Sequence, residues 1–238
     1  MPPIGRDHNK DAPMPFTPYI QTKQDLIDAV LEYGIVPFFA GSIPGFSIEE
    51  HVDPRAWFYD GIKGVWEWKG PVIRQAGCAY GKFFQKKAAF VRRDVFADLA
   101  NYRRNGYDYE GFFNDGFAPL KDKALYDLLE AKGPLLSKEL KKLGNYRKGG
   151  ASGFDTCINW LQAQCFVLIS DFVYQTDRFG NEYGWGIAEY ATPEQFMGSG
   201  FARDVYRCEP EESYGRLLGL VSRLFPSVSV DEIKKFVG

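Results

Sequence analysis

The segment from residue 121 to residue 191 most constrains the fold, because its pattern changes from helix to strand in a fixed order. Three stretches repeat apolar residues at three- and four-residue spacing, the period of an amphipathic helix, and two later stretches are rich in β-branched and aromatic residues. The helical stretches are 122–132, 138–143 and 154–164, and the strand-like ones are 166–174 and 183–190. Gly180 and Asn181 suit a tight hairpin turn between the strands. Helix, short helix, helix and hairpin is the order of a winged helix-turn-helix.

A winged helix-turn-helix predicts where nucleic acid is contacted. Its first two helices brace the third, which enters the major groove, while the hairpin tip touches neighbouring phosphates. The exposed side of the third helix is expected to carry Asn159 and Gln162, and amide side chains can bond to adenine through two hydrogen bonds, so these two are the candidate base readers. Asp155, near the start of that helix, favours the helix dipole but repels phosphate. The candidate phosphate contacts are Lys138, Lys141, Lys142, Arg147, Lys148 and Arg178.

Charge is distributed unevenly along the chain. The 238 residues carry a formal net charge of −2, yet residues 63–104 hold ten lysines and arginines against three acidic residues. A clustered basic face attracts phosphate through its local field whatever the total charge. Within residues 121–191, nine basic residues are balanced by nine acidic ones, so charge alone does not distinguish a DNA partner from a protein partner there. The candidate nucleic-acid-binding cations of the 63–104 segment are Lys82, Lys86, Lys87, Arg92 and Arg93.

Aromatic residues are interleaved with these cations, at Tyr80, Phe83, Phe84 and Phe90. Such rings can stack on the bases of single-stranded or distorted nucleic acid. On alternating strands the same rings face the core and the lysines face solvent. We favour the core for most of the rings, with the basic face as a guide for phosphate.

The remaining segments predict an α+β protein: a winged helix-turn-helix embedded in a compact, mainly helical chain with short β-hairpins. A helix opens at Thr22 and ends at Gly34, and the apolar run 35–40 suggests a buried strand. Residues 65–91 suggest a hairpin or a pair of strands, Asp94 is a candidate helix cap, and residues 105–115 suggest an irregular connection. The expected organisation is a flexible proline-rich tail at 1–18, an α+β lobe at 19–120, a winged-helix lobe at 121–208 and C-terminal helices at 209–238, the last of them starting at Ser229.

Several classes of site are not expected. The four cysteines form no Cys-x-x-Cys pair and there are only two histidines, so we expect no metal site. The sequence contains no glycine-rich nucleotide loop and no cofactor fingerprint, so no cofactor is expected. No stretch approaches the roughly twenty apolar residues of a membrane span, so we expect a cytoplasmic protein in a reducing setting, with no membrane partner.

Three stretches resemble a known family. They are Gly-Pro-Leu-Leu-Ser-Lys-Glu-Leu at 133–140, Trp-Leu-Gln-Ala-Gln-Cys at 160–165 and Tyr-Ala-Thr-Pro-Glu at 190–194. Together they resemble the AlkZ/YcaQ group, and particularly its short AlkZ-related proteins, over about residues 25–195. The aromatic and basic stretch from Trp66 to Arg104 is similar to the region before the middle winged helix of that group. The larger members are bacterial DNA glycosylases with tandem winged helices around a DNA channel, so the resemblance implies double-stranded DNA, intact or damaged, as the partner.

The catalytic pattern of those glycosylases is missing. They carry Gln-x-Gln or Gln-x-Asp in the N-terminal part, whereas residues 35–53 of this chain contain no glutamine. Gln162 and Gln164 match Gln-x-Gln by letter, but they lie on the expected recognition helix, and we treat the match as coincidence. No glycosylase residue is therefore carried over.

A glycosylase-like hydrolase needs a carboxylate beside an aromatic pocket. The candidates are Glu50 and Asp53, near Trp57, and Glu67, between two tryptophans. Helix capping explains these carboxylates equally well, because Glu50 can pair with Ser47 and Asp53 can cap a helix. The sequence predicts a DNA-binding winged-helix protein related to lesion recognition or repair, without an assigned catalytic residue. The alternatives are a non-catalytic module that binds protein, and a transcriptional regulator.

Overall fold

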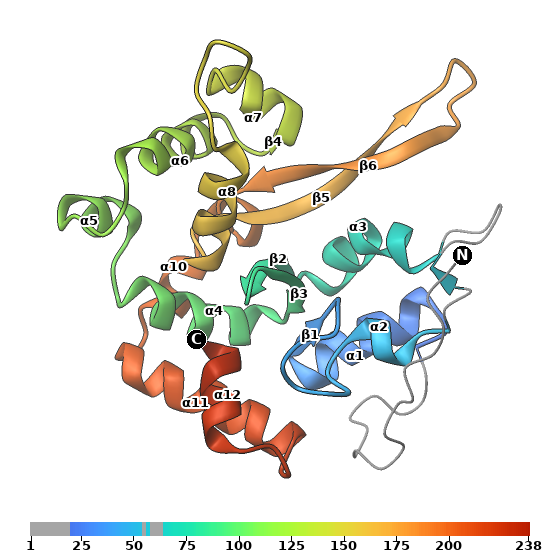
Figure 1. Cartoon of the computed structure of the whole chain (residues 1–238), viewed down its shortest axis with the longest axis vertical. Helices are drawn as coiled ribbons and strands as arrows, with labels where there is room; N and C mark the ends of the chain where they lie inside the picture. Colours follow the sequence, from blue (N-terminus) through green and yellow to red (C-terminus); the bar gives the residue numbers. More distant parts are fainter. Residues whose placement is uncertain (1–19, 54–55, 58–63) are drawn as a thin grey trace.

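The computed structural model describes residues 20–53, 56–57 and 64–238. Over this part the protein is α+β: helices surround two small antiparallel sheets, with strand orders β1-β3-β2 and β4-β6-β5 (Figure 1). The expected class is therefore confirmed. The proposed tail at 1–18 and the first residue of the basic segment, Lys63, lie outside the described residues.

The chain begins with a capped helix and a buried sheet. Helix α1 (Lys23–Tyr33) has a capping box, because Thr22 Oγ accepts from the N–H of Asp25 while the Asp25 carboxylate accepts from the N–H of Thr22. Gly34, with φ of 78°, ends the helix. Strand β1 (Ile35–Pro37) pairs with β3 (Lys87–Val91), which pairs with β2 (Ala79–Phe84). A short helix, α2 (Ile48–His51), follows β1.

The first part of the expected hairpin region is a helix instead. Helix α3 (Val65–Ala76) buries Val65, Lys69, Val72 and Ile73, which recur at helical spacing. Its first turn is fixed by the Glu67 carboxylate, which accepts from the N–H of Gly64 at 2.9 Å. The expectation of strands is thus wrong for residues 65–76 and holds for the β2–β3 hairpin.

Two further helices lead to the middle of the chain. Helix α4 (Arg93–Arg104) follows Arg92 as its N-cap, so Asp94 lies inside the first turn and is not the cap. Helix α5 (Tyr109–Asn114) lies in the region expected to be irregular, and the Asp108 carboxylate caps it by accepting from the N–H of Gly111 at 2.8 Å.

The order of elements predicted for residues 121–191 is present. Helix α6 (Leu120–Lys132), α7 (Ser137–Leu143) and α8 (Phe154–Ala163) precede β5 (Leu168–Thr176) and β6 (Glu182–Ala191). The sequence did not predict β4 (Leu135–Leu136), which pairs with β6 and closes the sheet. Strands β5 and β6 form a long ribbon whose far end extends away from the body of the molecule (Figure 1).

The C-terminal part consists of four helices. They are α9 (Pro193–Met197), α10 (Phe201–Val205), α11 (Pro210–Leu224) and α12 (Val230–Val237). Helix α11 packs on α4 and on α12. Ser229 caps α12 as expected, with its hydroxyl accepting from the N–H of Glu232.

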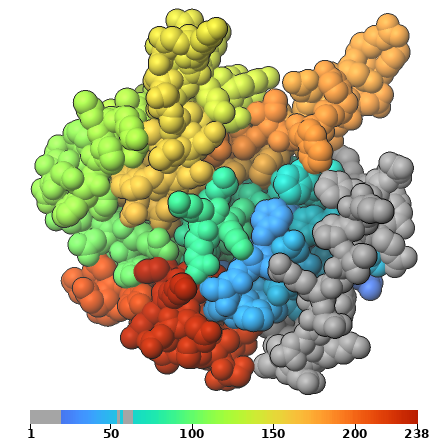
Figure 2. All heavy atoms as spheres, in the orientation of Figure 1, coloured from blue at the N-terminus to red at the C-terminus, as the bar shows by residue number. Residues whose placement is uncertain are grey.

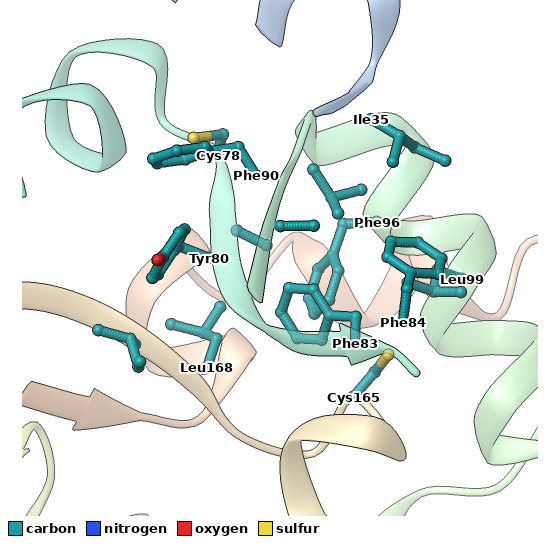
Figure 3. Packing of buried hydrophobic residues seen from close by; sticks show 14 of the residues in the cluster. Ile35, Cys78, Tyr80, Phe83, Phe84, Phe90, Phe96, Leu99, Cys165 and Leu168 are labelled. Atoms are coloured by element: carbon teal, nitrogen blue, oxygen red, sulfur yellow. The ribbon is translucent and has the colours of Figure 1, made fainter. Parts of the chain in front are cut away.

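A single core joins the two halves of the chain. Phe83 of β2 and Phe96 of α4 have ring centroids 4.9 Å apart, Cys165 lies beside Phe83, and Leu168 lies beside Tyr80 (Figure 3). Strand β2 packs against both α8 and β5. The second sheet is therefore held in place by residues from the first half of the sequence.

Candidate nucleic-acid interface

Helix α7 and the loop after it form a basic turn, which we define as residues 137–153. Lys138, Lys142, Arg147 and Lys148 are exposed in this turn. Lys141 is half-buried, with its Nζ 3.7 Å from Asp155 Oδ1 and 4.7 Å from the centroid of the Phe154 ring. Four of the five cations are therefore free to meet a ligand in solvent, and the fifth is oriented by Asp155.

The basic turn encloses a shallow hollow of about 240 Å³. Its lining includes Lys141, Tyr146, Arg147 and Phe154. The Arg147 guanidinium donates to Asn145 Oδ1 at 2.8 Å, which fixes the start of its side chain within the turn. A hollow with two cationic side chains at the start of helix α8 suits an anionic group such as a phosphate.

The far end of the ribbon presents aromatic rings to solvent. Phe179 is 74% exposed and Tyr183 is 53% exposed. The Arg178 guanidinium lies 4.6 Å from the centroid of the Phe179 ring. The turn is ordered by Asp177, whose carboxylate accepts from the N–H groups of Phe179 and Asn181. The sequence predicted Arg178 here but not the exposed rings.

The ribbon is held against α3 by contacts from both of its strands. The rings of Trp66 and Trp185 meet edge to face at 5.8 Å, and Arg74 forms an ion pair with Asp171 of β5. Lys69 Nζ lies 3.4 Å from the centroid of the Trp66 ring and 4.2 Å from that of Phe172. Burial lowers the pKa of Lys69 to about 8, although the charge of Glu67 acts in the opposite direction. These contacts tie the direction of the ribbon to the N-terminal half of the chain.

The basic turn and the far end of the ribbon lie at the same end of the molecule. In Figure 1 both stand at the top of the view, and Figure 2 shows them as two projections from the body. Cations and aromatic rings are thus presented on one side, which is the arrangement that a nucleic-acid surface needs.

The two candidate base readers differ in exposure. Asn159 is partly exposed on α8. Gln162 is 1% exposed, donates to the carbonyl of Ile158 at 3.1 Å and accepts from the N–H of Lys82 at 3.1 Å. The expectation that Gln162 lies on the solvent side of the helix is wrong, because β2 covers the C-terminal end of α8.

The second group of candidate cations lies elsewhere. Lys86 and Lys87 are at the turn between β2 and β3, where Lys87 donates to the carbonyl of Ala40. The neighbouring Gln85 donates to the carbonyl of Lys235 in α12, and α12 lies at the opposite end of the molecule from α7 (Figure 1). Lys82 is half-buried beside the end of α8. The structure therefore does not bring this turn to the basic turn of 137–153.

Arg92 and Arg93 are committed to internal contacts. The Arg92 guanidinium binds the Asp94 carboxylate at 2.6 and 2.9 Å and the carbonyl of Leu31 at 2.6 Å. Arg93 donates to Asp204 and to the carbonyl of Met197. Both side chains hold the start of α4 to its neighbours, and these contacts account for them without a ligand.

The chain was compared with models of known protein families, and one of them matches almost all of it. The model described as AlkZ related matches residues 20–238. The chain belongs to the AlkZ-related family. The match extends beyond the 25–195 of the sequence resemblance and includes the C-terminal helices α11 and α12. No curated protein and no solved structure matches the chain.

In this AlkZ-related protein the three candidate catalytic residues form hydrogen bonds with residues close to them in the sequence. Glu50 accepts from the N–H of Gly45 at 2.9 Å and from the hydroxyl of Ser47 at 2.6 Å. Glu67 caps α3 through the N–H of Gly64, and the backbone carbonyl of Asp53 accepts from the N–H of Ala56. Hydrogen bonds of this kind account for Glu50 and Glu67 without a substrate.

The described part of the AlkZ-related protein contains neither a metal-binding cluster nor a membrane-spanning helix. Over residues 20–53, 56–57 and 64–238, histidine, cysteine and acidic side chains form no group of three or more that could hold a metal ion. None of the helices in the same part of the chain has both the length and the apolar composition of a membrane span.

Proposed function

We propose that this AlkZ-related protein binds double-stranded DNA through residues 120–191, which act as a winged helix, and that it serves in lesion recognition or repair. The observation that carries the proposal is that the basic turn at 137–153 and the aromatic far end of the ribbon project from the same end of the molecule. The relation to DNA glycosylases that comes with family membership supports DNA as the partner.

The basic turn supplies the phosphate contacts in this proposal. Lys138, Lys142, Arg147 and Lys148 are exposed, and cations of this kind position a protein on the duplex without reading its sequence. Asn159 remains the candidate base reader on α8. Gln162 has no part in it, because its amide is buried and hydrogen-bonded within the protein.

The ribbon supplies the contact that separates damaged from intact DNA. Phe179 and Tyr183 are aromatic rings in solvent, and rings of this type insert between bases or stack on unpaired ones. A mismatch or abasic position lowers the cost of unstacking, so such a contact favours damaged sites. Arg178 adds a cation beside the Phe179 ring for the adjoining phosphate.

Salt dependence tests the phosphate contacts. Fluorescence anisotropy with a labelled duplex should give a dissociation constant that rises with salt. The double variant Lys142→Gln, Arg147→Gln should lower the slope of log K against log salt by about 1.8, since each phosphate contact contributes about 0.9. Lys234→Gln, Lys235→Gln in α12 changes the same charge at the other end of the molecule and is the control.

A lack of affinity at low salt contradicts DNA binding and favours the protein-binding alternative. Equal effects of the two double variants contradict the location of the interface.

Truncation of an exposed ring tests the ribbon. Phe179→Ala should weaken binding to a duplex with an abasic position more than binding to the intact duplex. Leu120→Ala removes a similarly exposed apolar side chain outside the ribbon and is the control. Identical losses on both duplexes would show that the ring does not discriminate lesions. A base-release assay on alkylated and crosslinked DNA then decides whether recognition is accompanied by catalysis.

A further inference from the structure

A second charged site lies between α4 and α11, away from the basic turn and the ribbon (Figure 1). It is an open hollow of about 680 Å³. The charged groups that line it are Arg92, Asp94, Asp98, Arg207, Glu212, Arg216 and Arg223. Arg92 is paired with Asp94, whereas Arg223 has no carboxylate partner in the described part of the chain. The hollow thus contains more guanidinium groups than carboxylates to pair with them.

One carboxylate at the hollow serves two arginines. Asp98, whose side chain is 10% exposed, accepts from Arg216 at 2.7 and 2.9 Å and from Arg207 at 3.2 Å. Glu212 is the other acid near Arg216, but it is largely exposed and its oxygen is 3.9 Å away. Two half-exposed cations therefore face one nearly buried carboxylate, which leaves an excess of positive charge at this place.

Cys208 lies beside this cluster, next to the lining residue Arg207 in the chain. Its Sγ lies 2.7 Å from Arg216 Nη2, 3.3 Å from Ser213 Oγ and 3.8 Å from Asn101 Nδ2. Asn101 is 1% exposed, and its amide donates to the carbonyl of Cys208 at 2.8 Å and to Ser213 Oγ at 3.0 Å, while its Oδ1 has no hydrogen-bond partner among the described residues. The cationic group nearest the sulfur is therefore the Arg216 guanidinium, and a charged donor of this kind stabilises an anion.

The balance of local effects favours the thiolate at Cys208. Burial acts to raise the pKa of Cys208, but the hydrogen bonds from Ser213 and Arg216 and the charge of Arg216 outweigh it, and the pKa lies below its usual value. The charge of Asp98 acts against this effect without reversing it. The remaining cysteines are buried, and burial raises the pKa of both Cys78 and Cys165 to about 12. Of the four thiols, Cys208 alone combines solvent access with a lowered pKa.

We propose that Cys208 is a modification site that exchanges with small disulfides carrying carboxylates, the class to which glutathione disulfide belongs. The carboxylates lie against Arg207 and Arg223 in the hollow while one sulfur reaches Cys208. The thiolate attacks that sulfur, a new S–S bond forms as the old one breaks, and the other half of the disulfide leaves as a thiolate. The disulfide is the oxidant, and the step needs no proton transfer at Cys208. This inference does not depend on DNA binding.

Three disulfides of different charge test the site on the full chain. They are the dianionic 5,5′-dithiobis(2-nitrobenzoate), the neutral 4,4′-dithiodipyridine and the dicationic cystamine, each with its rate divided by its rate with free N-acetylcysteine. The normalised rate should fall from anionic to neutral to cationic. Intact mass should show one addition, located at Cys208 by peptide mapping, and glutathione disulfide should add at the same position. Cys208→Ser should remove the addition.

Arg223→Gln tests the hollow without touching the thiol. It should lower the rate with the anionic disulfide about fivefold, the effect of one charge at about 4 Å in water, and leave the rate with the neutral disulfide unchanged. Arg203→Gln changes the same charge on the exposed side of α10 and is the control. Any of three results would overturn the proposal: additions at other cysteines, a normalised rate that does not depend on the charge of the disulfide, or equal effects of the two arginine variants.

Discussion

Replacing Lys69 with methionine isolates the cost of a buried ammonium at the base of the ribbon. Lys69 is 4% exposed, and its Nζ contacts the rings of Trp66 and Phe172 rather than a carboxylate. Methionine has a similar length and removes the titrating group. Moving the pKa of this lysine from 10.5 to about 8 corresponds to about 3 kcal/mol, since one pKa unit is worth about 1.4 kcal/mol.

The sign of the effect follows from proton binding. Below about pH 8 both the folded and the unfolded states hold the proton, and the full cost of burying the charge is present. Between pH 8 and 10.5 the unfolded state holds the proton and the folded state does not, so the free energy of unfolding rises with pH. Across this range the free energy of unfolding of the wild type should therefore rise by up to about 3 kcal/mol relative to that of Lys69→Met. At pH 7 the methionine variant should be the more stable.

Urea unfolding followed by circular dichroism at intervals between pH 7 and 10.5 measures this difference. The contacts with Trp66 and Phe172 favour the charged form by about 0.5–2 kcal/mol, which opposes the desolvation cost. A free-energy difference that stays constant over the whole pH range would refute the reasoning, because the aromatic contacts would then balance the cost of burial.

Three further substitutions have defined outcomes. Arg104→Gln should lower the free energy of unfolding by about 3–5 kcal/mol in urea titrations, because the buried guanidinium binds both Glu194 at 2.8 Å and the carbonyl of Cys165 at 2.6 Å. Thr22→Ala should cost about 1 kcal/mol in the same assay through loss of the α1 cap, and an unchanged midpoint would contradict that role. Gln162→Leu should cost about 1–3 kcal/mol, because the N–H of Lys82 loses its acceptor, and should leave DNA affinity unchanged in anisotropy. A selective loss of affinity in Gln162→Leu would restore Gln162 as a base reader.

Segments whose periodicity is strong and local were predictable from the sequence. The helices α6, α7 and α8 and the ribbon follow from repeats within each segment, and the capping signals of Thr22 and Ser229 mark their helices correctly. Strand β4 has two residues, too few to show any period. Helix α3 was missed because its aromatic and β-branched residues suggest strands, although Glu67 three residues after Gly64 and the spacing of Val65, Lys69 and Val72 were available as helical signals.

Contacts between distant parts of the chain were not predictable. The sequence of α8 alone does not show that Gln162 is buried, because Lys82, which donates to its side chain, is eighty positions earlier in the chain. The sequence suggests Arg93 as a phosphate contact, because its ion pair with Asp204 appears only in the folded chain. The surroundings of Cys208 come from α4 and α11, so no motif around that cysteine signals them.

Because the ribbon is attached to α3, a small rotation of α3 moves the far end of the ribbon by a larger distance. From Phe172, where α3 contacts β5, to Phe179 is seven residues, or about 23 Å at about 3.3 Å per residue. A rotation of about 10° at this contact would move the Phe179 ring by about 4 Å, more than the thickness of one base step of 3.4 Å. Small rearrangements in the N-terminal half, far from any basic residue of the turn at 137–153, are therefore amplified at the point where the rings meet solvent (Figure 1).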